Sequence, residues 1–433
     1  MSARPEIASF LKALDRTQYL PADQMRAYQR RLLEALLRHA RAETDFYAER
    51  LAPVFRADDT INWDRWHDIP IVTRKDVQEN FAPLSARTLP KMAGETIEDT
   101  SSGSTGRPVR YLQTGIQHLA SACCGERFFH WHGLRPEALT ARIRAAADPA
   151  TAYPGGRRVA GWRIGQPDSP VIDLSIATPA KQQIEWLQRV HPSYLISYPS
   201  NLRELARVAD AAGERLRFNL LLSFGEMATD DMREAISGHF GMAPLDRYGS
   251  TEVGHVSGTC PHSLKHHLSA EVVFMEVLDE DGNPVAPGTP GRVIVTPFYG
   301  LAMPLIRYEI GDYAVMSPDP CGCGRTLPLI ERILGRTRNI FRFADGSAVW
   351  PVLLSRDLKT YVPLQQFQTI QHSLTDIEFR YVPASREQTN DLAGLERYIR
   401  TRLHASVSVR ATAVDAIPRS PGGKFEDYLS LVS

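Results

Sequence analysis

Short apolar runs, each followed by a helical pattern, dominate the middle of the chain and constrain its fold more than any other feature. Residues 192–198 and 220–224 are two such runs, and helical patterns follow them at 202–212 and 230–240. A strand followed by a helix, repeated, is typical of an α/β core in which largely parallel strands are buried. The sequence therefore predicts an α/β fold built on parallel sheets.

Two signals in the first eighty residues predict helices. Between residues 22 and 51, leucine and alanine recur at helical spacing with arginine and glutamate between them, which predicts an amphipathic surface helix. Residues 69–76 read as a loop that enters a further helix, with Thr73 as its N-cap.

The pattern changes after Leu268. Residues 271–278 and 291–297 alternate apolar and polar side chains, and residues 279–282 form a turn between them. This arrangement is typical of antiparallel hairpins, so we expect a small antiparallel, barrel-like region beside the parallel sheets.

The glycine-rich motifs end at Arg336, and about a hundred residues of mixed strand and helix pattern follow. We place a domain boundary near Arg338. The expected organisation is a large domain over residues 1–336 and a small, mobile α+β domain over residues 337–433.

Composition excludes several classes of function. The chain has 433 residues with 50 basic and 50 acidic side chains, so no global basic field is present to hold nucleic acid or an anionic membrane. Residues 1–16 lack the apolar core of a secretory signal, and no apolar run approaches the ~18 residues of a membrane span. The five cysteines are a poor disulfide framework. We expect a cytoplasmic protein that acts on small molecules. A homodimer is compatible with the sequence, which does not determine the oligomeric state.

Hydroxyl groups and glycines crowd together at residues 100–108. Glycine lets the backbone approach an anion closely, and successive N–H groups form a nest for phosphate oxygens. The Gly-Lys-Ser/Thr ending of a Walker loop is absent. A flexible Ser/Gly loop is the alternative reading of this stretch. The residues expected to hold phosphates are Ser102, Gly103, Ser104, Thr105, Gly106 and Arg107.

Four further motifs follow this loop in order. Residues 248–252 read Tyr-Gly-Ser-Thr-Glu, and residues 307–312 place Asp312 just after a glycine turn. Gly335-Arg336 and the Pro-Gly-Gly-Lys ending of residues 418–424 complete the set. The five motifs together resemble the adenylate-forming superfamily of acyl- and aryl-CoA ligases, peptide-synthetase adenylation domains and luciferases.

The closest branch is the phenylacetate–CoA ligase family. Its resemblance is carried by residues 102–106, 224–227, 304–308 and 321–325. The resemblance implies an ATP-dependent, AMP-forming ligase that activates a carboxylic acid, of aromatic type, as an acyl-adenylate. CoA is the implied acceptor, and an amine or another small nucleophile is the alternative.

The resemblance also implies roles for individual residues. Lys424 would bridge the carboxylate and α-phosphate while the adenylate forms, which suits a compact ammonium group on a mobile loop. Thr251 would contact the α-phosphate and Glu252 would hold Mg²⁺. Asp312, assisted by Arg336, would bind the ribose hydroxyls. The expected adenine-side residues are Gly225, Glu226, Tyr248 and Gly249.

Thiols and imidazoles form a second cluster. Cys321 and Cys323 flank one glycine, and Cys260 is followed by His266 and His267. Two thiolates with a distant Cys/His pair fit a tetrahedral zinc set, and two unrelated loops with free thiols are the alternative. The resemblance favours structural zinc within residues 260–323, on Cys260, His267, Cys321 and Cys323, with His266 as the rival of His267. Cys123 and Cys124 are expected in the core.

Aromatic runs at residues 128–131 and 198–200 fall where the family houses its acid. The resemblance implies a substrate pocket at Phe129, His130 and Tyr198, for a flat aromatic acid. The alternative is that these side chains belong to the core.

The chain departs from the family at three places. Arg107 replaces a lysine, which keeps the cation. Residues 337–339 replace a pair of aspartates at the hinge, and residues 343–348 read as an ordinary hairpin turn where CoA ligases line the thiol tunnel. Adenylation is therefore better supported than transfer to CoA. A non-catalytic nucleotide-binding relative and a zinc-organised interaction module are the readings from other classes.

Overall fold

The computed structural model of the chain describes residues 5–101, 108–336, 339–384, 390–420 and 422–432. The expected α/β fold is confirmed, because helices and strands are both abundant and a large sheet with a parallel half runs through the molecule. Within these residues, no helix combines the length and the apolar character needed to cross a membrane.

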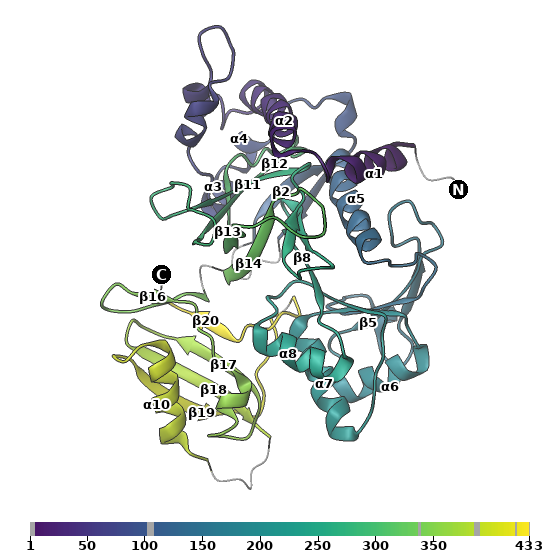
Figure 1. Cartoon of the computed structure of the whole chain (residues 1–433), viewed down its shortest axis with the longest axis vertical. Helices are drawn as coiled ribbons and strands as arrows, with labels where there is room; N and C mark the ends of the chain where they lie inside the picture. The colour runs from purple at the N-terminus through teal and green to yellow at the C-terminus, as the bar shows by residue number, and fades with distance from the viewer. Residues whose placement is uncertain (1–4, 102–107, 337–338, 385–389, 421, 433) are drawn as a thin grey trace.

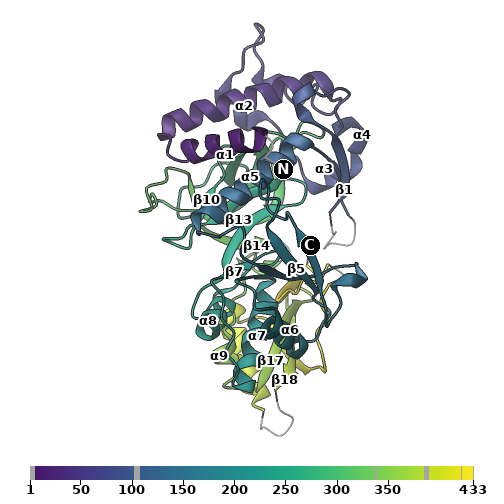
Figure 2. The same ribbon diagram turned by 90° about the vertical axis from the view of Figure 1, so that its right-hand side faces the viewer.

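Two helices, α1 (Pro5–Thr17) and α2 (Ala22–Glu43), cover one end of the molecule (Figure 2). The α2 helix buries Leu33, Leu36 and Leu37, as its spacing predicts. The expectation of a helix as far as residue 51 is wrong for the last eight residues. Thr44 takes an extended conformation, and both its N–H and its hydroxyl donate to Ala40 O, which ends the helix.

Short helices connect α2 to the first strands. Thr73 caps α3 as predicted: Asp76 N–H donates to Thr73 Oγ1 at 3.2 Å, and Thr73 N–H donates to the Asp76 carboxylate at 2.8 Å. The two-stranded hairpin of β1 and β2 follows. These elements are 52–54, 63–68 and 91–93 (each a 3-10 helix), α3 (Arg74–Glu79), α4 (Phe81–Leu84), β1 (Thr96–Thr100) and β2 (Arg110–Thr114).

The parallel half of the large sheet runs in the order β8-β7-β6-β3-β5, with β4 antiparallel at its edge. Leucine and isoleucine side chains of β6 and β7 are fully buried, and helices α6, α7 and α8 pack beside them (Figure 1). The elements are α5 (Gly115–Trp131), β3 (Thr140–Arg144), β4 (Arg157–Ala160), β5 (Pro170–Ser175), α6 (Ala180–Val190), β6 (Tyr194–Ser197), α7 (Pro199–Ala212), β7 (Leu220–Ser223), α8 (Asp230–Phe240) and β8 (Leu245–Ser250).

The antiparallel half continues from the same strand, because β8 pairs in parallel with β7 and antiparallel with β9. The predicted hairpin over residues 271–297 is present, and Gly282 N–H closes its turn onto Asp279 O. The order is β11-β12-β13-β14-β10-β9-β8. The elements are β9 (Gly254–Thr259), β10 (His266–Leu268), β11 (Val273–Leu278), β12 (Pro290–Pro297), β13 (Tyr308–Met316) and β14 (Leu329–Arg336).

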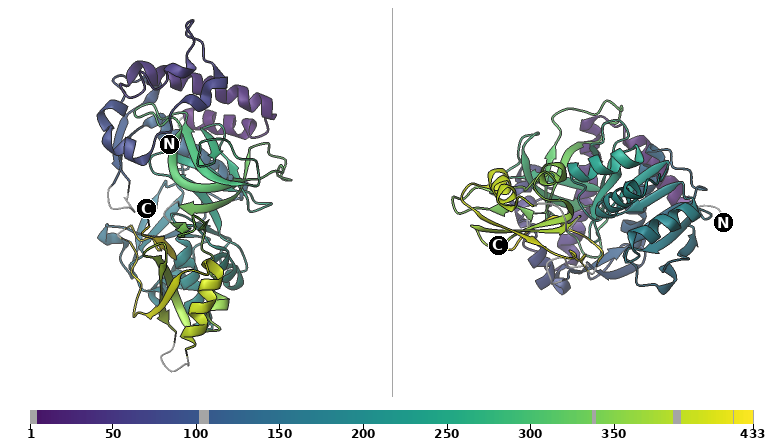
Figure 3. Two further views of the ribbon diagram at one scale, coloured as in Figure 1. Left: turned by 90° about the vertical axis from the view of Figure 1, so that its left-hand side faces the viewer. Right: turned by 90° about the horizontal axis from the view of Figure 1, so that it is seen from below.

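The strands after residue 339 form sheets of their own, beside α7 and α8 (Figures 1 and 3). Residues 341–349 form a tight hairpin, as predicted, in which Phe343 N–H donates to Ser347 O. The elements are β15 (Phe341–Arg342), β16 (Ala348–Val349), α9 (Ser355–Leu358), β17 (Leu364–Gln371), β18 (Asp376–Pro383), α10 (Leu392–Leu403), β19 (Ser408–Ala413) and β20 (Tyr428–Ser430). A division at residue 336 and its mobility stay predictions.

Candidate active site and Cys/His cluster

A cavity of about 480 Å³ lies where residues 424–428 meet α8, β8 and β14. Its volume is in the range of small-molecule sites. Seven residues that the sequence assigned to ATP binding or catalysis line this one cavity although the chain separates them by up to 200 positions. They are Gly225, Glu226, Tyr248, Gly249, Asp312, Arg336 and Lys424.

Tyr248 and Asp312 join the two halves of the cavity wall. The Tyr248 hydroxyl donates to Asp312 Oδ2 at 2.9 Å, and Arg336 Nε lies 3.9 Å from Asp312 Oδ1. Asp312 and Arg336 are register partners on β13 and β14, so the sheet itself fixes their distance. Burial, and then the Asp312 carboxylate, hold the pKa of Tyr248 well above its usual value. The result is a carboxylate acceptor beside a neutral aromatic ring.

Glu252 lies just beyond the end of β8. Thr251 Oγ1 donates to Glu252 Oε2 at 3.2 Å, and the Tyr308 hydroxyl donates to Oε1 at 3.1 Å. The Glu252 side chain is buried, whereas Thr251 is exposed. Carboxylate oxygens are the ligands that a hard cation such as Mg²⁺ prefers. The donor chemistry of Glu252 therefore fits the expected magnesium ligand.

Lys424 reaches the cavity on a tight turn before β20. Gly423 N–H donates to Ser420 O at 2.8 Å, and Ser420 N–H donates to Lys424 O at 2.8 Å. Gly225 lies against both Tyr198 and Lys424, since a Cβ at this position would lie 3.3 Å from the Tyr198 ring and 3.4 Å from Lys424 Cε. Gly225 also has a φ of +76°, which favours glycine.

Glu226 holds this turn in place, a role that the sequence did not reveal. Its carboxylate accepts from Phe425 N–H at 2.6 Å and from Ser200 N–H at 3.1 Å. Arg419 donates to the same carboxylate at 3.3 Å and to Ser200 Oγ at 2.7 Å. Burial raises the pKa of Glu226. Glu226, which the sequence analysis placed beside adenine, therefore also holds residues 419–425 against the large sheet region.

A half-buried arginine makes a second contact between the same two parts of the chain, and the sequence analysis missed it. Arg203 on α7 lies 3.3 Å from Asp427 and 3.7 Å from Asp231, and Asp231 also accepts from Ser355 N–H at 2.8 Å. Charge patterns along the sequence carry no signal for this network, because its members are distant in the chain.

The expected phosphate loop, Ser102 to Arg107, lies outside the described residues. Its base is described. Ser101 N–H donates to Val109 O at 2.8 Å, Val109 N–H donates to Ser101 Oγ at 3.0 Å, and β1 pairs with β2 just before this point. The predicted loop therefore connects two paired strands.

The residues expected to form the acid pocket do not line the large cavity. Phe129 is buried in a cluster with Phe128 and Leu222. His130 Nε2 lies 3.3 Å from Glu126, and Tyr198 donates to Gly422 O at 3.0 Å. Their role in binding the acid stays a prediction.

The four expected metal ligands meet at one point. One ligand atom from each of Cys260, His267, Cys321 and Cys323 lies within 4.8 Å of all the others. Cys260 Sγ is 3.5 Å from Cys321 Sγ, and His267 Nε2 is 3.2 Å from Cys323 Sγ. Ligands about 2.0–2.3 Å from a tetrahedral zinc ion would be roughly 3.5 Å apart, so the donor set fits zinc.

The rival histidine faces away from the cluster. His266 and His267 are neighbours on β10, so their side chains point to opposite faces. His266 Nδ1 lies 3.2 Å from Ser257 Oγ. The cluster thus contains His267 and not His266, and binding of a metal by His267 stays a prediction. Cys123 and Cys124 are buried in α5, as predicted.

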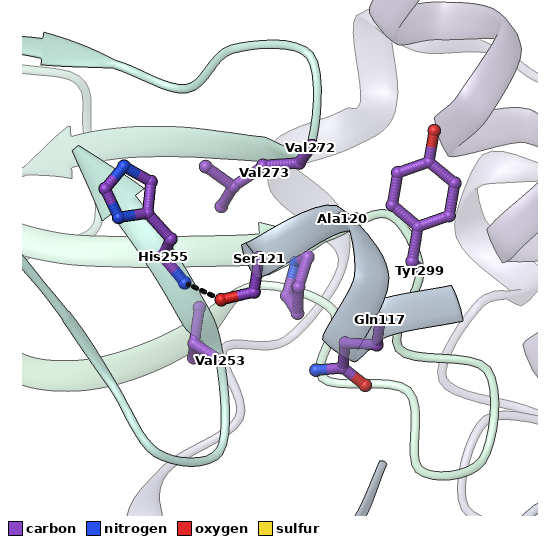
Figure 4. Close-up of a pocket in the computed structure, with 9 residues that line it drawn as sticks. Gln117, Ala120, Ser121, Val253, His255, Val272, Val273 and Tyr299 are labelled. Atoms are coloured by element: carbon purple, nitrogen blue, oxygen red, sulfur yellow. Dashed lines mark hydrogen bonds between the residues drawn. The ribbon is translucent and has the colours of Figure 1, made fainter. Parts of the chain in front are cut away.

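A second, much smaller cavity lies between α5 and β9 (Figure 4). Gln117, Ser121, His255 and Tyr299 are among its lining residues, and His255 N–H donates to Ser121 Oγ at 3.0 Å. Its volume of about 10 Å³ is no larger than a water molecule needs, so it is not a ligand site.

Comparison with known sequences identifies relatives along almost the whole chain, although no family model matches. Phenylacetate-coenzyme A ligase of Escherichia coli (strain K12) is 26% identical over 439 residues, which cover 94% of this chain and 95% of the relative. Phenylacetate-coenzyme A ligase of Thermus thermophilus is 25% identical, and the match covers 95% of this chain and 98% of the relative.

Among solved structures, 2-hydroxyisobutyryl-CoA ligase in its postadenylation state with 2-HIB-AMP has a TM-score of 0.74 at 17% identity, over 97% of this chain and 92% of that one. The same enzyme in its thioesterification state with CoA has a TM-score of 0.60, over 96% of this chain and 92% of that one. The fold is shared in both cases.

Proposed function

The similarity to phenylacetate–CoA ligases along almost the whole chain confirms the expected branch of the adenylate-forming superfamily, and we propose that this chain is an ATP-dependent, AMP-forming acid–CoA ligase. One observation carries the proposal most directly. Lys424, from the C-terminal part of the chain, shares a cavity with Tyr248, Asp312 and Arg336 from the large sheet. A cation, an aromatic ring and a carboxylate around one cavity are the groups that a nucleotide and an anionic acid require.

Nucleotide binding follows from the charges of the cavity wall. Asp312 would accept from the ribose hydroxyls, with Arg336 beside it, and Tyr248 would pack against adenine next to Gly225 and Gly249. The phosphates would lie toward Thr251 and the predicted loop of Ser102 to Arg107. Mg²⁺, when bound by Glu252, would neutralise phosphate charge.

Lys424 would act in adenylation. The acid's carboxylate oxygen attacks the α-phosphorus, a P–O bond forms, and the bond to pyrophosphate breaks. Negative charge grows on the oxygens around phosphorus, and an ammonium group held at that point stabilises it. The hydrogen bonds of Glu226 and the ion pairs of Arg203 hold the turn that carries Lys424 in this position, so both residues act as positioning residues.

Transfer to CoA would require residues 339–433 to leave this position. The contacts that hold them include hydrogen bonds and ion pairs, such as those of Glu226 and Arg203, which can exchange for water when the two parts separate. CoA is the proposed acceptor. An amine remains the alternative because the hairpin of residues 341–349 differs from the tunnel-lining segment of the family.

We further propose that the Cys/His cluster holds one structural zinc ion. Four protein ligands leave no open position for substrate, so the ion would stabilise the junction of β9, β10 and the loop before β14. Elemental analysis of metal-washed protein checks this, with one zinc per chain expected and a zinc-free protein as the contradicting result.

ATP–pyrophosphate exchange tests the first half-reaction. The protein is incubated with ATP, labelled pyrophosphate and each member of a panel of carboxylic acids. Exchange that depends on one class of acid is the expected result. A protein that binds ATP yet shows no exchange with any acid would be a nucleotide-binding relative without this activity.

A further inference from the structure

A half-buried arginine in the wall of the large cavity has no carboxylate paired with it. Arg247 lies on β8, directly before Tyr248, and lines the large cavity. No hydrogen bond or ion pair joins its guanidinium to any described residue. The fully buried arginines Arg127 and Arg163 differ, since Arg127 pairs with Glu271 at 2.5 Å and Arg163 pairs with Glu126 at 2.6 Å. Removal from water lowers the pKa of Arg247, and the charge of the neighbouring Asp246 opposes this shift only in part.

The surroundings of Arg247 are aromatic. Its guanidinium carbon lies 5.2 Å from the centre of the Phe129 ring and 6.0 Å from that of Phe128. Phe129 in turn packs edge-on against Trp162, with ring centres 5.4 Å apart. These rings attract the cation but cannot neutralise its charge.

Helix α5 leaves room for this side chain. A Cβ at Gly125 would lie 2.9 Å from Arg247 Nη1, closer than real contacts allow. Glycine is unfavourable in the middle of a helix, so its presence here has a packing reason. Glycine at this position therefore lets the end of the Arg247 side chain lie directly against α5.

Neither Asp246 nor His255, the nearby acid and base, accepts a hydrogen bond from the Arg247 guanidinium. Asp246 precedes it on β8 and so projects from the opposite face of the strand. His255 is kept neutral, since burial holds its pKa well below the usual value. A fork of N–H donors without an acceptor, in the wall of the cavity that also holds Lys424, is a site for an anionic group.

We propose that the acid substrate is dianionic: one carboxylate is activated beside Lys424, and a second carboxylate at the far end of the molecule is bound by Arg247. This inference rests on the proposed function and names its substrate class. A bidentate pair between this second carboxylate and the guanidinium would orient the molecule in the cavity.

Matched pairs of acids test the inference by ATP–pyrophosphate exchange: phenylacetate with 4-carboxyphenylacetate, benzoate with isophthalate, and hexanoate with adipate. We expect the wild-type kcat/KM to favour the dicarboxylate of at least one pair by tenfold or more. Arg247→Met should lower that preference by roughly 10- to 100-fold, mainly through KM. Arg247→Lys keeps the positive charge and loses the planar pair of N–H donors. Its preference for the dicarboxylate should lie between those of the wild type and of Arg247→Met. Arg207→Gln, which removes a surface arginine on α7, should keep the wild-type preference.

The outcomes separate this inference from the proposed function. Exchange with monocarboxylates alone, or an unchanged preference in Arg247→Met, would overturn the inference and leave the function standing. Absence of exchange with every acid would contradict both. A structural role for Arg247 would lower exchange equally with both members of a pair. If Arg247→Met does not fold, the inference is tested by the dicarboxylate preference of the wild type and by the loss of that preference in Arg247→Lys.

Discussion

The Cys/His cluster and the Lys424 cavity are assembled in different ways. The cluster takes its four ligands from residues 260–323, all within the antiparallel half of the large sheet and its loops. The cavity takes Lys424 from beyond residue 339 and most of its other functional residues from before residue 336. One site is thus complete within a single sheet region, whereas the other exists only while two parts of the chain are in contact.

The contacts around each site fit this difference. Backbone pairing of β10 with both β9 and β14 fixes His267. The turn that carries Lys424 is held to the large sheet region by side-chain contacts from Glu226 and Arg203. A site fixed by sheet pairing suits a permanent structural role. A site closed by polar side chains suits a reaction in which one part must move between two steps.

The largest effect is expected at the cavity. Lys424→Ala should lower acid-dependent ATP–pyrophosphate exchange by about 100- to 1,000-fold, because one charge contact in the transition state is worth ~3–4 kcal/mol. Consumption of a chemically prepared acyl-adenylate should continue at the wild-type rate. Lys359→Ala, at an exposed lysine of the same part, is the control and should leave both rates unchanged. Equal loss of both half-reactions would show that Lys424 serves more than adenylation.

The cluster should respond in stability instead. Cys321→Ser should remove zinc from the protein and lower the free energy of unfolding by more than about 3 kcal/mol, because a lost metal ligand is among the most destabilising changes. Folded enzyme that remains should keep its KM for ATP. Ser263→Ala is the matched control, since Ser263 Oγ lies 3.6 Å from Cys321 Sγ and is not a ligand. Unchanged unfolding by urea in both variants would disprove a structural role.

Asp246 links the two regions and predicts a pH dependence. It lines the cavity, and its N–H donates to Thr259 Oγ1, next to Cys260. Burial raises its pKa to about 7, above the ordinary 3.8. An acid whose folded pKa is raised stabilises the fold below its unfolded pKa and loses that contribution as pH rises toward 7. Between pH 5 and 7 the wild type should lose about 2 kcal/mol relative to Asp246→Asn, measured by urea unfolding. Parallel stability curves for the two proteins would contradict this assignment.

A smaller effect on exchange is expected at Glu226, which holds the turn that carries Lys424. Glu226→Gln keeps the shape of the side chain and removes the charge that pairs with Arg419, so exchange should fall by about tenfold. Zinc content should not change. Glu204→Gln, which breaks a surface pair with Arg207, is the control. A loss of zinc in Glu226→Gln would mean that the two regions are not independent.

The sequence predicted features that depend on local pattern. The strands and helices over residues 194–240, the Thr73 cap and the hairpin near residue 280 all follow from neighbouring residues. The end of α2 was not predicted from the local pattern, because Thr44 ends the helix through its own hydrogen bonds to Ala40 O.

Ordered motifs in the sequence predicted which residues belong to the Lys424 cavity. They did not predict the contacts that hold the Lys424 turn in place. The motifs placed Asp312, Arg336 and Lys424 in one function, and the cavity brings them together. Arg203 and Glu226 act through residues more than 190 positions away, so neither has a signal in its local sequence. Adjacent histidines offered two zinc ligands, and only the register of β10 distinguishes them.

Release of AMP with and without CoA tests the central claim most directly. The enzyme is given ATP and an acid that supports exchange, and AMP is measured alone, with CoA and with hydroxylamine. The account predicts slow release alone, strong acceleration by CoA, and an acyl-CoA product in equal amount to AMP. If CoA leaves the rate unchanged while hydroxylamine accelerates it, the acceptor is an amine-type nucleophile and the thioester reading is wrong.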